Sequence, residues 1–314
     1  MLLSWLSNWV INFLLMILLL WNGRLFAQPS EPYVIVLGIA QDAGVPQAGC
    51  QKNCCRHRWN DPKQQERITC LAIVDPATSE RWLIDATPDF KAQLRMVDEI
   101  APSKPLAGIF LTHGHIGHYT GLMQLGREAM GALAIPVYVM PRMEKFLSHN
   151  GPWDQLVRLK NIVLRPMPSD STIVLNTRLQ ITPFLVPHRD EYTETVGFRI
   201  TGPHQSVLFI PDIDKWEKWE RRIEDMIASV DVAYIDGTFY ADGEIPGRNM
   251  KEIPHPFMVE TMARLAALPL AQKNKIRFIH LNHTNPALRR GTNARADLKK
   301  AGFRVAAEKE RVGL

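Results

Sequence analysis

Three histidines lie within one short segment, "HGHIGH", at His113, His115 and His118. The apolar run "GIFLT" at 108–112 precedes them and is typical of a buried β-strand. Alternate side chains at a strand end share one side, so His113 and His115 can converge on one ion, and His118 can face the same cavity. Imidazole is a good ligand for zinc, iron or manganese. The spacing predicts a metal centre after this strand, and a surface cluster without metal is the alternative.

The first 27 residues form a separate segment of the chain. The run "VINFLLMILLLW" at 10–21 is apolar apart from Asn12, but it is shorter than the ~20 residues that a comfortable membrane span needs. The polar sequence after it favours a signal peptide cleaved after Ala27, with an uncleaved membrane anchor as the alternative. We therefore expect residues 28–314 to form one exported domain, periplasmic or secreted, that meets a membrane only if the anchor is retained.

The composition is that of an ordinary globular protein. The chain has 314 residues, of which 46% are hydrophobic and 22% charged. Its net charge of +5 is spread out, without the Lys/Arg block of a nucleic-acid arm. We expect a small-molecule substrate and no nucleic-acid partner.

Strand-like and helix-like segments alternate along the chain. Short β-rich runs lie at 33–38, 70–75, 81–86, 108–112, 136–140, 179–186, 195–200, 206–211, 231–236 and 276–281. Helices are expected at 89–100, 118–130, 215–228, 257–267 and 294–301. Interspersed helices and an excess of strands predict two sheets with helices packed outside them.

The histidine motif resembles that of the metallo-β-lactamase fold superfamily, in which it usually reads H-x-H-x-D-H. The segments "LVPHRDEYTETVGFRI", "VLFIPDID" and "RFIHLNHTNP" resemble the family's later motifs and follow in its order. They place the corresponding ligands at His188, Asp212 and His280. The resemblance implies an α/β (α+β) fold, a four-layer αββα sandwich, for residues 28–314.

The resemblance also implies which residues hold metal. The implied ligands are His113, His115 and His188 for a first ion, His118 and His280 for a second, and Asp212 for both. One or two divalent ions would bind, with zinc favoured and manganese or iron as alternatives. Two ions can lower the pKa of a bound water to about 7 and make it a nucleophile. Asp212 could instead cap the turn after its strand.

Gly117 occupies the position of the Asp that usually completes the family's second site. A glycine offers no ligand, so the second site should be weaker, and a site with one metal is an open alternative. Asp236 or Asp190 could compensate, or could equally be structural turn residues.

Three further segments resemble the coenzyme PQQ synthesis protein B group: "VLGIAQDAGVPQAGCQKNCC", "IDATPDFKAQL" and "HLNHTNP". A carbon-phosphorus-lyase-associated phosphodiesterase and tRNase Z are similar more distantly. His255, in "IPHPFMVETMARLA", resembles a histidine that assists proton transfer in the tRNase Z group. Asp212 and His255 are therefore the predicted catalytic residues, although His255 could simply begin a helix without a chemical task.

Cys50, Cys54 and Cys55 cluster in "GCQKNCC". In the resembling families a comparable loop binds a structural zinc, and by analogy with the phosphodiesterase His283 would complete the site here. Because an exported protein meets oxidising conditions, a disulfide is the competing interpretation.

These observations favour an exported metal-dependent hydrolase, which would use a metal-activated water on an ester or phosphodiester bond of a small molecule. An oxidative enzyme of cofactor biosynthesis, similar to PQQ synthesis protein B, is the first alternative. A degenerate metal-binding protein without catalysis, suggested by Gly117, is the second. Trp153 could form an aromatic wall for a substrate or pack its own helix.

Overall fold

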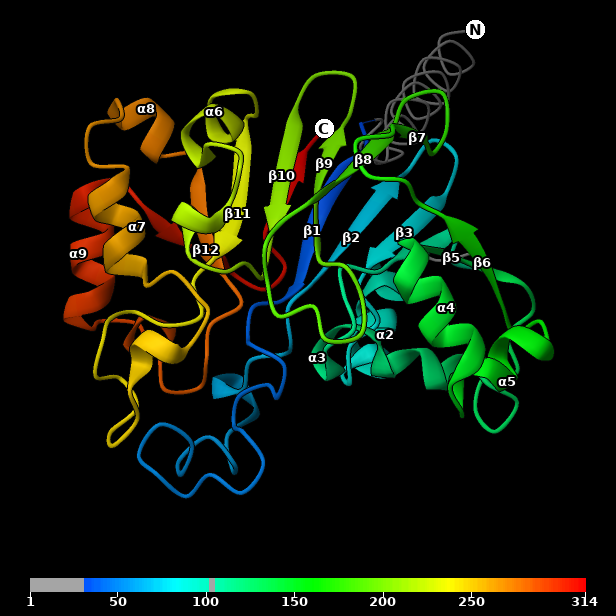
Figure 1. The fold of residues 1–314 in the computed structure, drawn as a ribbon, viewed down its shortest axis with the longest axis horizontal. Helices are drawn as coiled ribbons and strands as arrows, with labels where there is room; N and C mark the ends of the chain where they lie inside the picture. The colour runs from blue at the N-terminus through cyan, green and yellow to red at the C-terminus, as the bar shows by residue number, and fades with distance from the viewer. Residues whose placement is uncertain (1–30, 102–104) are drawn as a thin grey trace, which may run out of the picture.

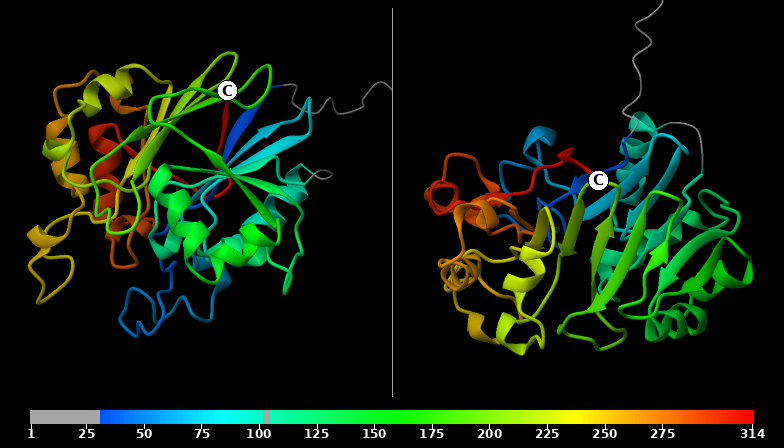
Figure 2. Two further views of the ribbon diagram at one scale, coloured as in Figure 1. Left: turned by 45° about the vertical axis from the view of Figure 1, so that its right-hand side comes forward. Right: turned by 90° about the horizontal axis from the view of Figure 1, so that it is seen from above.

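Two β-sheets lie face to face, with helices on their outer faces (Figure 1, Figure 2). The structure is a computed structural model that describes residues 31–101 and 105–314, so the predicted signal peptide or anchor at 1–27 lies outside the described residues. The four layers confirm the expected αββα sandwich. Within the described ranges, no helix is both long and apolar enough to cross a membrane.

The first sheet has the strand order β14-β1-β2-β3-β4-β5-β6. Its strands are β1 (Tyr33–Gly38), β2 (Cys70–Asp75), β3 (Glu80–Ile84), β4 (Gly108–Phe110), β5 (Ile135–Val139), β6 (Ile162–Pro166) and β14 (Arg311–Gly313). Strands β3 to β6 are parallel neighbours, whereas β14, β1, β2 and β3 pair antiparallel. The helices on this side are α2 (Phe90–Ile100), α3 (Ile116–Tyr119), α4 (Pro141–His149) and α5 (Trp153–Arg158).

The second sheet has the order β13-β12-β11-β10-β9-β8-β7. Its strands are β7 (Ile173–Val174), β8 (Gln180–Leu185), β9 (Val196–Thr201), β10 (Ser206–Ile210), β11 (Val232–Asp236), β12 (Ile276–Ile279) and β13 (Arg304–Val305). Strands β10 to β13 are parallel, and β7 to β10 pair antiparallel. The helices on this side are α6 (Ile223–Ala228), α7 (Met258–Arg264), α8 (Leu270–Lys273) and α9 (Asn293–Ala301).

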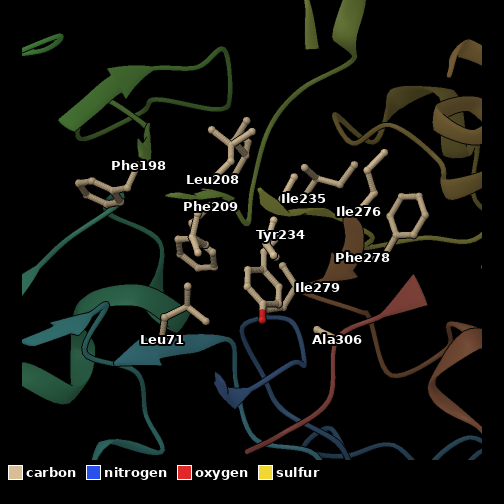
Figure 3. Close-up of a cluster of buried hydrophobic side chains, with 14 of the residues drawn as sticks. Leu71, Phe198, Leu208, Phe209, Tyr234, Ile235, Ile276, Phe278, Ile279 and Ala306 are labelled. Carbon is tan, nitrogen blue, oxygen red and sulfur yellow. The ribbon is translucent and has the colours of Figure 1, made fainter. Parts of the chain in front are cut away.

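Side chains of the first sheet alternate between two hydrophobic cores. In β1, Val34 and Val36 belong to the core shared with the second sheet, whereas Ile35 and Leu37 belong to the core under the helices. This follows from the two-residue period of a strand, and it explains why β1 is apolar throughout: both of its faces are buried. Figure 3 shows the shared core, where Leu71 of the first sheet lies near aromatic residues of the second. Two packed sheets provide the rigid frame from which the site loops emerge.

The expected helix at 118–130 is wrong as a continuous α-helix. The structure has only α3, followed by a 3₁₀ turn at Thr120–Leu125. The backbone of Ala86 competes for helical hydrogen bonds, since its N–H donates to the carbonyl of His118 at 2.8 Å and its carbonyl accepts from Gly121 N at 2.9 Å. Gly121 permits this approach, because a Cβ there would lie 2.1 Å from the Thr87 oxygen.

The expected helix at 215–228 is also interrupted, into a 3₁₀ turn at Trp216–Lys218 and α6. The two tryptophans are anchored to different elements: the Trp216 indole donates to Thr261 and the Trp219 indole donates to the carbonyl of Leu185. Trp219 has an extended backbone, which breaks the helical run. The sequence pattern also missed α4, α5 and α8 and the strands β6, β7, β13 and β14.

Candidate metal centre

The six predicted metal ligands lie at one edge of the sandwich, each after the carboxyl end of a strand. His113, His115 and His118 follow β4, His188 follows β8, Asp212 follows β10, and His280 follows β12. Carboxyl ends of strands that point the same way meet at one edge, which is the usual place of a site in an α/β fold. The structure therefore brings together side chains that are far apart in sequence.

The first group consists of His113, His115, His188 and Asp212, whose ligand atoms all lie within 4.8 Å of one another. The two carboxylate oxygens of Asp212 face different rings: Oδ2 lies 3.3 Å from Nε2 of His113, and Oδ1 lies 3.2 Å from Nε2 of His188. Nε2 of His113 and Nδ1 of His115 are 2.9 Å apart. These are the residues expected around a first ion.

The second group consists of Asp42, His118, Asp212 and His280, again within 4.8 Å. Oδ2 of Asp212 lies 3.7 Å from Nε2 of both His118 and His280, so this carboxylate is shared by the two groups as expected. Oδ1 of Asp42 lies 3.1 Å from Nε2 of His118 and 3.8 Å from Nε2 of His280. Asp42, in the turn after β1, was missed by the sequence analysis.

Neither residue suggested as a substitute for the missing motif Asp reaches the second group. Asp190 is exposed and pairs with Arg142 at 3.2 Å, so that suggestion is wrong. Asp236 lies in a third group with His255 and Asp212, and Oδ2 of Asp236 accepts hydrogen bonds from Ile213 N and from His255 Nδ1. The carboxylate beside His118 is that of Asp42.

The imidazoles of His118 and His280 are held by hydrogen bonds at their Nδ1 atoms. Nδ1 of His118 lies 2.7 Å from Oδ2 of Asp85, and Oδ1 of the same carboxylate accepts the Thr112 N–H. Nδ1 of His280 lies 3.0 Å from Oγ1 of Thr238. Such contacts fix ring orientation and leave Nε2 available to a metal. Asp85 was missed as a site residue, although it follows β3 in the quoted segment "IDATPDF".

Two of these residues have left-handed backbone conformations, with φ of 72° at Asp85 and 65° at His280. This region is uncommon for residues other than glycine, and such conformations concentrate at functional sites. The left-handed conformation of His280 ends β12 at Ile279, two residues before the end of the predicted strand. The His280 side chain thereby faces the cluster.

Several buried polar atoms of the cluster have no partner in hydrogen-bond geometry within residues 31–101 and 105–314. They are Oδ1 of Asp42, Nε2 of His118, both ring nitrogens of His188, Oδ1 of Asp212 and Nε2 of His280. A buried polar group without a partner costs roughly 1–3 kcal/mol, and here they converge. Nitrogen and carboxylate donors are ligands of divalent first-row metals, so the residues present fit a metal centre.

The pKa shifts suit metal binding by the first group. Burial lowers the pKa of His188 to about 4. Burial and the nearby His118 hold the pKa of His113 well below its usual value. Burial opposes ionisation of Asp212, but the surrounding histidines, His188 foremost, hold its pKa well below the usual value. These are the neutral imidazoles and the charged carboxylate that a cation requires.

His255 lies beside this cluster, as predicted, and is buried. Its Nδ1 lies 2.8 Å from Oδ2 of Asp236 and 3.2 Å from Oδ1 of Asp212. Burial lowers its pKa, but the two carboxylates outweigh burial and raise the pKa to about 9. With Nδ1 engaged by Asp236, Nε2 is the ring nitrogen left to exchange a proton.

Cys50, Cys54, Cys55 and His283 form a separate group of potential ligands. Cys50 and Cys54 sulfurs are 3.6 Å apart, and Nδ1 of His283 lies 3.4 and 3.3 Å from the sulfurs of Cys54 and Cys55. Tetrahedral zinc with two such ligand types separates its ligand atoms by roughly 3.5–3.8 Å. All four cysteines are free in the structure, Cys70 being buried elsewhere, so the predicted disulfide alternative is not what the structure shows.

A hollow of about 530 Å³ lies beside Asp42 and His115. Its aromatic lining comes from Tyr119, Phe146, Trp153 and Tyr192, and the ring centroids of neighbouring pairs lie 5.0–5.9 Å apart. Arg189 adds a cation. The Trp153 indole N–H is buried and has no hydrogen-bond partner among the described residues. Trp153 thus packs against neighbouring rings and also lines the hollow, and its role as a substrate wall stays a prediction.

The comparisons with known proteins agree with this geometry. The family described as "Beta-lactamase superfamily domain" matches residues 80–281. Coenzyme PQQ synthesis protein B of Xanthomonas euvesicatoria pv. vesicatoria (strain 85-10) is 28% identical over 303 residues, covering 87% of this chain and 97% of the relative. The corresponding protein of Methylobacterium sp. (strain 4-46) is 27% identical over 300 residues, covering 87% and 96%.

Solved structures share the fold. Zinc-bound PqqB from Methylobacterium extorquens superposes with a TM-score of 0.75 at 24% identity, covering 90% of this chain and 100% of that one. A diphosphatase from the PhnP family gives a TM-score of 0.62 at 20% identity, covering 90% and 97%. The short form of human tRNase Z gives 0.54 at 14% identity, covering 89% and 98%.

Proposed function

This chain belongs to the β-lactamase superfamily, and we propose that it is an exported metal-dependent hydrolase that cleaves an ester or phosphodiester bond of a small molecule. The observation that carries the proposal is the convergence of two ligand groups on one shared carboxylate, Asp212, with unpartnered histidine nitrogens around it. Export is inferred from the apolar segment at 10–21 in the sequence.

His113, His115, His188 and Asp212 would hold one divalent ion, and His118, His280 and Asp212 would contribute to a second. Divalent ions in such a site supply Lewis acidity and make water nucleophilic near neutral pH. Zinc is the first expectation, and manganese or iron would suit the same donors. The cysteine group with His283 would hold a further, structural zinc.

The protein's own residues would perform the remaining steps. Asp212 spans both groups and would orient the nucleophile, while Asp236 fixes the orientation of the His255 ring. Through Nε2, His255 would give a proton to the leaving group or take one from water. Burial at this edge excludes bulk water, which strengthens these electrostatic contacts.

The hollow beside His115 would bind the part of the substrate that does not react. Its aromatic rings favour a flat apolar group, and Arg189 offers a partner to an anionic substituent. The size of the hollow, about 530 Å³, suits a small molecule.

The test uses protein purified from residue 28 onward, with metal content measured by elemental analysis. The zinc- or manganese-loaded protein is then assayed on pairs of esters and pairs of phosphodiesters. The two members of a pair share one leaving group, and the part that remains carries an aryl group in one member and an alkyl group in the other. We expect hydrolysis, with a lower KM for the aryl member. No turnover of any substrate with fully loaded protein would reject the proposal.

A second candidate is an oxidative reaction in cofactor biosynthesis, favoured by the relatedness to PQQ synthesis protein B over 97% of that protein's length. It predicts one equivalent of iron in the purified protein, and two or three equivalents of zinc or manganese would count against it. Metal binding without any turnover would instead favour the degenerate, non-catalytic alternative.

A further inference from the structure

We propose that Asp42 supplies the carboxylate of the second metal site, in place of the family motif's Asp, whose position Gly117 occupies. The inference rests on the proposed metal centre but not on the proposed reaction. Asp42 lies in the turn after β1, whereas the histidine motif follows β4.

Distance and burial support this assignment. Oδ1 of Asp42 lies 3.1 Å from Nε2 of His118 and 3.8 Å from Nε2 of His280, within the same group as Asp212. This oxygen is buried and has no partner in hydrogen-bond geometry among the described residues. Such an oxygen favours a cation beside it, and its two nearest ring nitrogens, Nε2 of His118 and Nε2 of His280, can share that cation.

The glycine at 117 is what admits the Asp42 turn. A Cβ at Gly117 would lie 2.2 Å from Oδ1 and 2.5 Å from Cα of Asp42. The space that a motif Asp would use is therefore filled by the side chain and backbone of Asp42. The two residues exclude each other, so an Asp at 117 would displace this turn rather than add a ligand to it.

The Asp42 turn is held against the strand end that carries His280. Gln41 N donates to the carbonyl of Leu281 at 2.9 Å, and the Asn282 side chain donates to Oε1 of Gln41 at 2.7 Å. A further bond from Gly44 N to the carbonyl of Gln41 at 2.8 Å closes the turn around Asp42. The turn that carries the carboxylate is thus held by backbone and side-chain hydrogen bonds, which preorganises a metal ligand.

Asp42→Asn tests the assignment with little change of shape, with Asp190→Asn as the matched control, because Asp190 is exposed and lies outside both groups. The readouts are zinc equivalents after dialysis and the Kd of each zinc by calorimetry. We expect Asp42→Asn to lose one equivalent, or to raise the Kd of one zinc by at least about 10-fold, and Asp190→Asn to match the wild type. Unchanged zinc binding in Asp42→Asn would overturn the assignment.

Gly117→Ala provides a second test, because its Cβ pushes directly on the Asp42 carboxylate. We expect it to weaken the same zinc, and unchanged binding would again contradict the assignment. Normal zinc binding by the wild type without hydrolysis would reject the proposed reaction while leaving the Asp42 assignment intact.

Discussion

The Nδ1 atom of His118 lies 2.7 Å from Oδ2 of Asp85, and both side chains are fully buried. The Asp85 carboxylate accepts the ring N–H, so the lone pair of His118 is placed on Nε2, facing Asp212 and Asp42. This contact selects the tautomer that can bind a metal. Burial disfavours the protonated ring, but Asp85 and Asp42 outweigh it and raise the pKa of His118 well above its usual value, so without a metal Nε2 carries a second proton that a bound metal would displace.

Asp85→Asn should therefore weaken zinc binding without breaking the fold. The amide oxygen can still accept the Thr112 N–H, while the amide NH₂ faces Nδ1 of His118 and forces the proton onto Nε2. We expect one zinc to bind about 10–100-fold more weakly by calorimetry. Equal zinc affinity in this variant would show that Asp85 does not set the tautomer.

His115→Ala should abolish the proposed activity. This side chain is less buried than the other ligands of the first group, so its removal should leave the fold intact. Loss of a direct ligand should lower kcat/KM by at least ~100-fold, beyond the effect of an outer contact. The measurement pairs steady-state kinetics with elemental analysis and thermal unfolding. Wild-type turnover with normal metal content would remove His115 from the site.

Cys54→Ser should lower thermal stability more than it alters chemistry. If the cysteine group binds a structural zinc, loss of a thiolate removes binding free energy that also stabilises the fold. We expect Tm to fall by at least about 2 °C, the shift that 1 kcal/mol produces in a large domain. A chelator should lower the wild-type Tm in the same way. A reducing agent that reproduced the effect would instead indicate a disulfide.

Stability should decline between mildly acidic and neutral pH because of Glu244. Burial raises the pKa of this carboxyl to about 7, from an ordinary value of 4.5. The folded state therefore keeps its proton where the unfolded state has lost it, so the stabilising effect is complete below pH 4.5 and is lost as the pH rises through 7.

Glu244→Gln checks this contribution by denaturant unfolding at pH 5 and pH 7. The neutral amide can accept the Tyr240 N–H and donate to Thr284, so the local contacts persist. We expect the variant to lose less stability than the wild type between the two pH values, by about 1 kcal/mol once partial exposure is allowed for. Identical pH profiles would show that Glu244 titrates normally.

Local spacing in the sequence predicted much of this protein. The histidine motif after an apolar strand, the strand runs with turn residues at their ends, and helices such as α2, α7 and α9 all depend on neighbouring residues. Such patterns are readable because a strand repeats every two residues and a helix every 3.6. The ordered motifs around His188, Asp212 and His280 likewise extended the resemblance to the whole αββα fold.

Tertiary structure alone decided which residues complete the site. Asp42 and Asp85 follow other strands than the histidine motif, and nothing in local spacing ties them to His118. Packing of the Asp42 turn against Gly117 determined where the missing carboxylate comes from, and hydrogen bonds to Ala86 broke the expected helix after His118. Contacts between distant segments form only when the two sheets pack, because packing brings the carboxyl ends of separate strands to one edge.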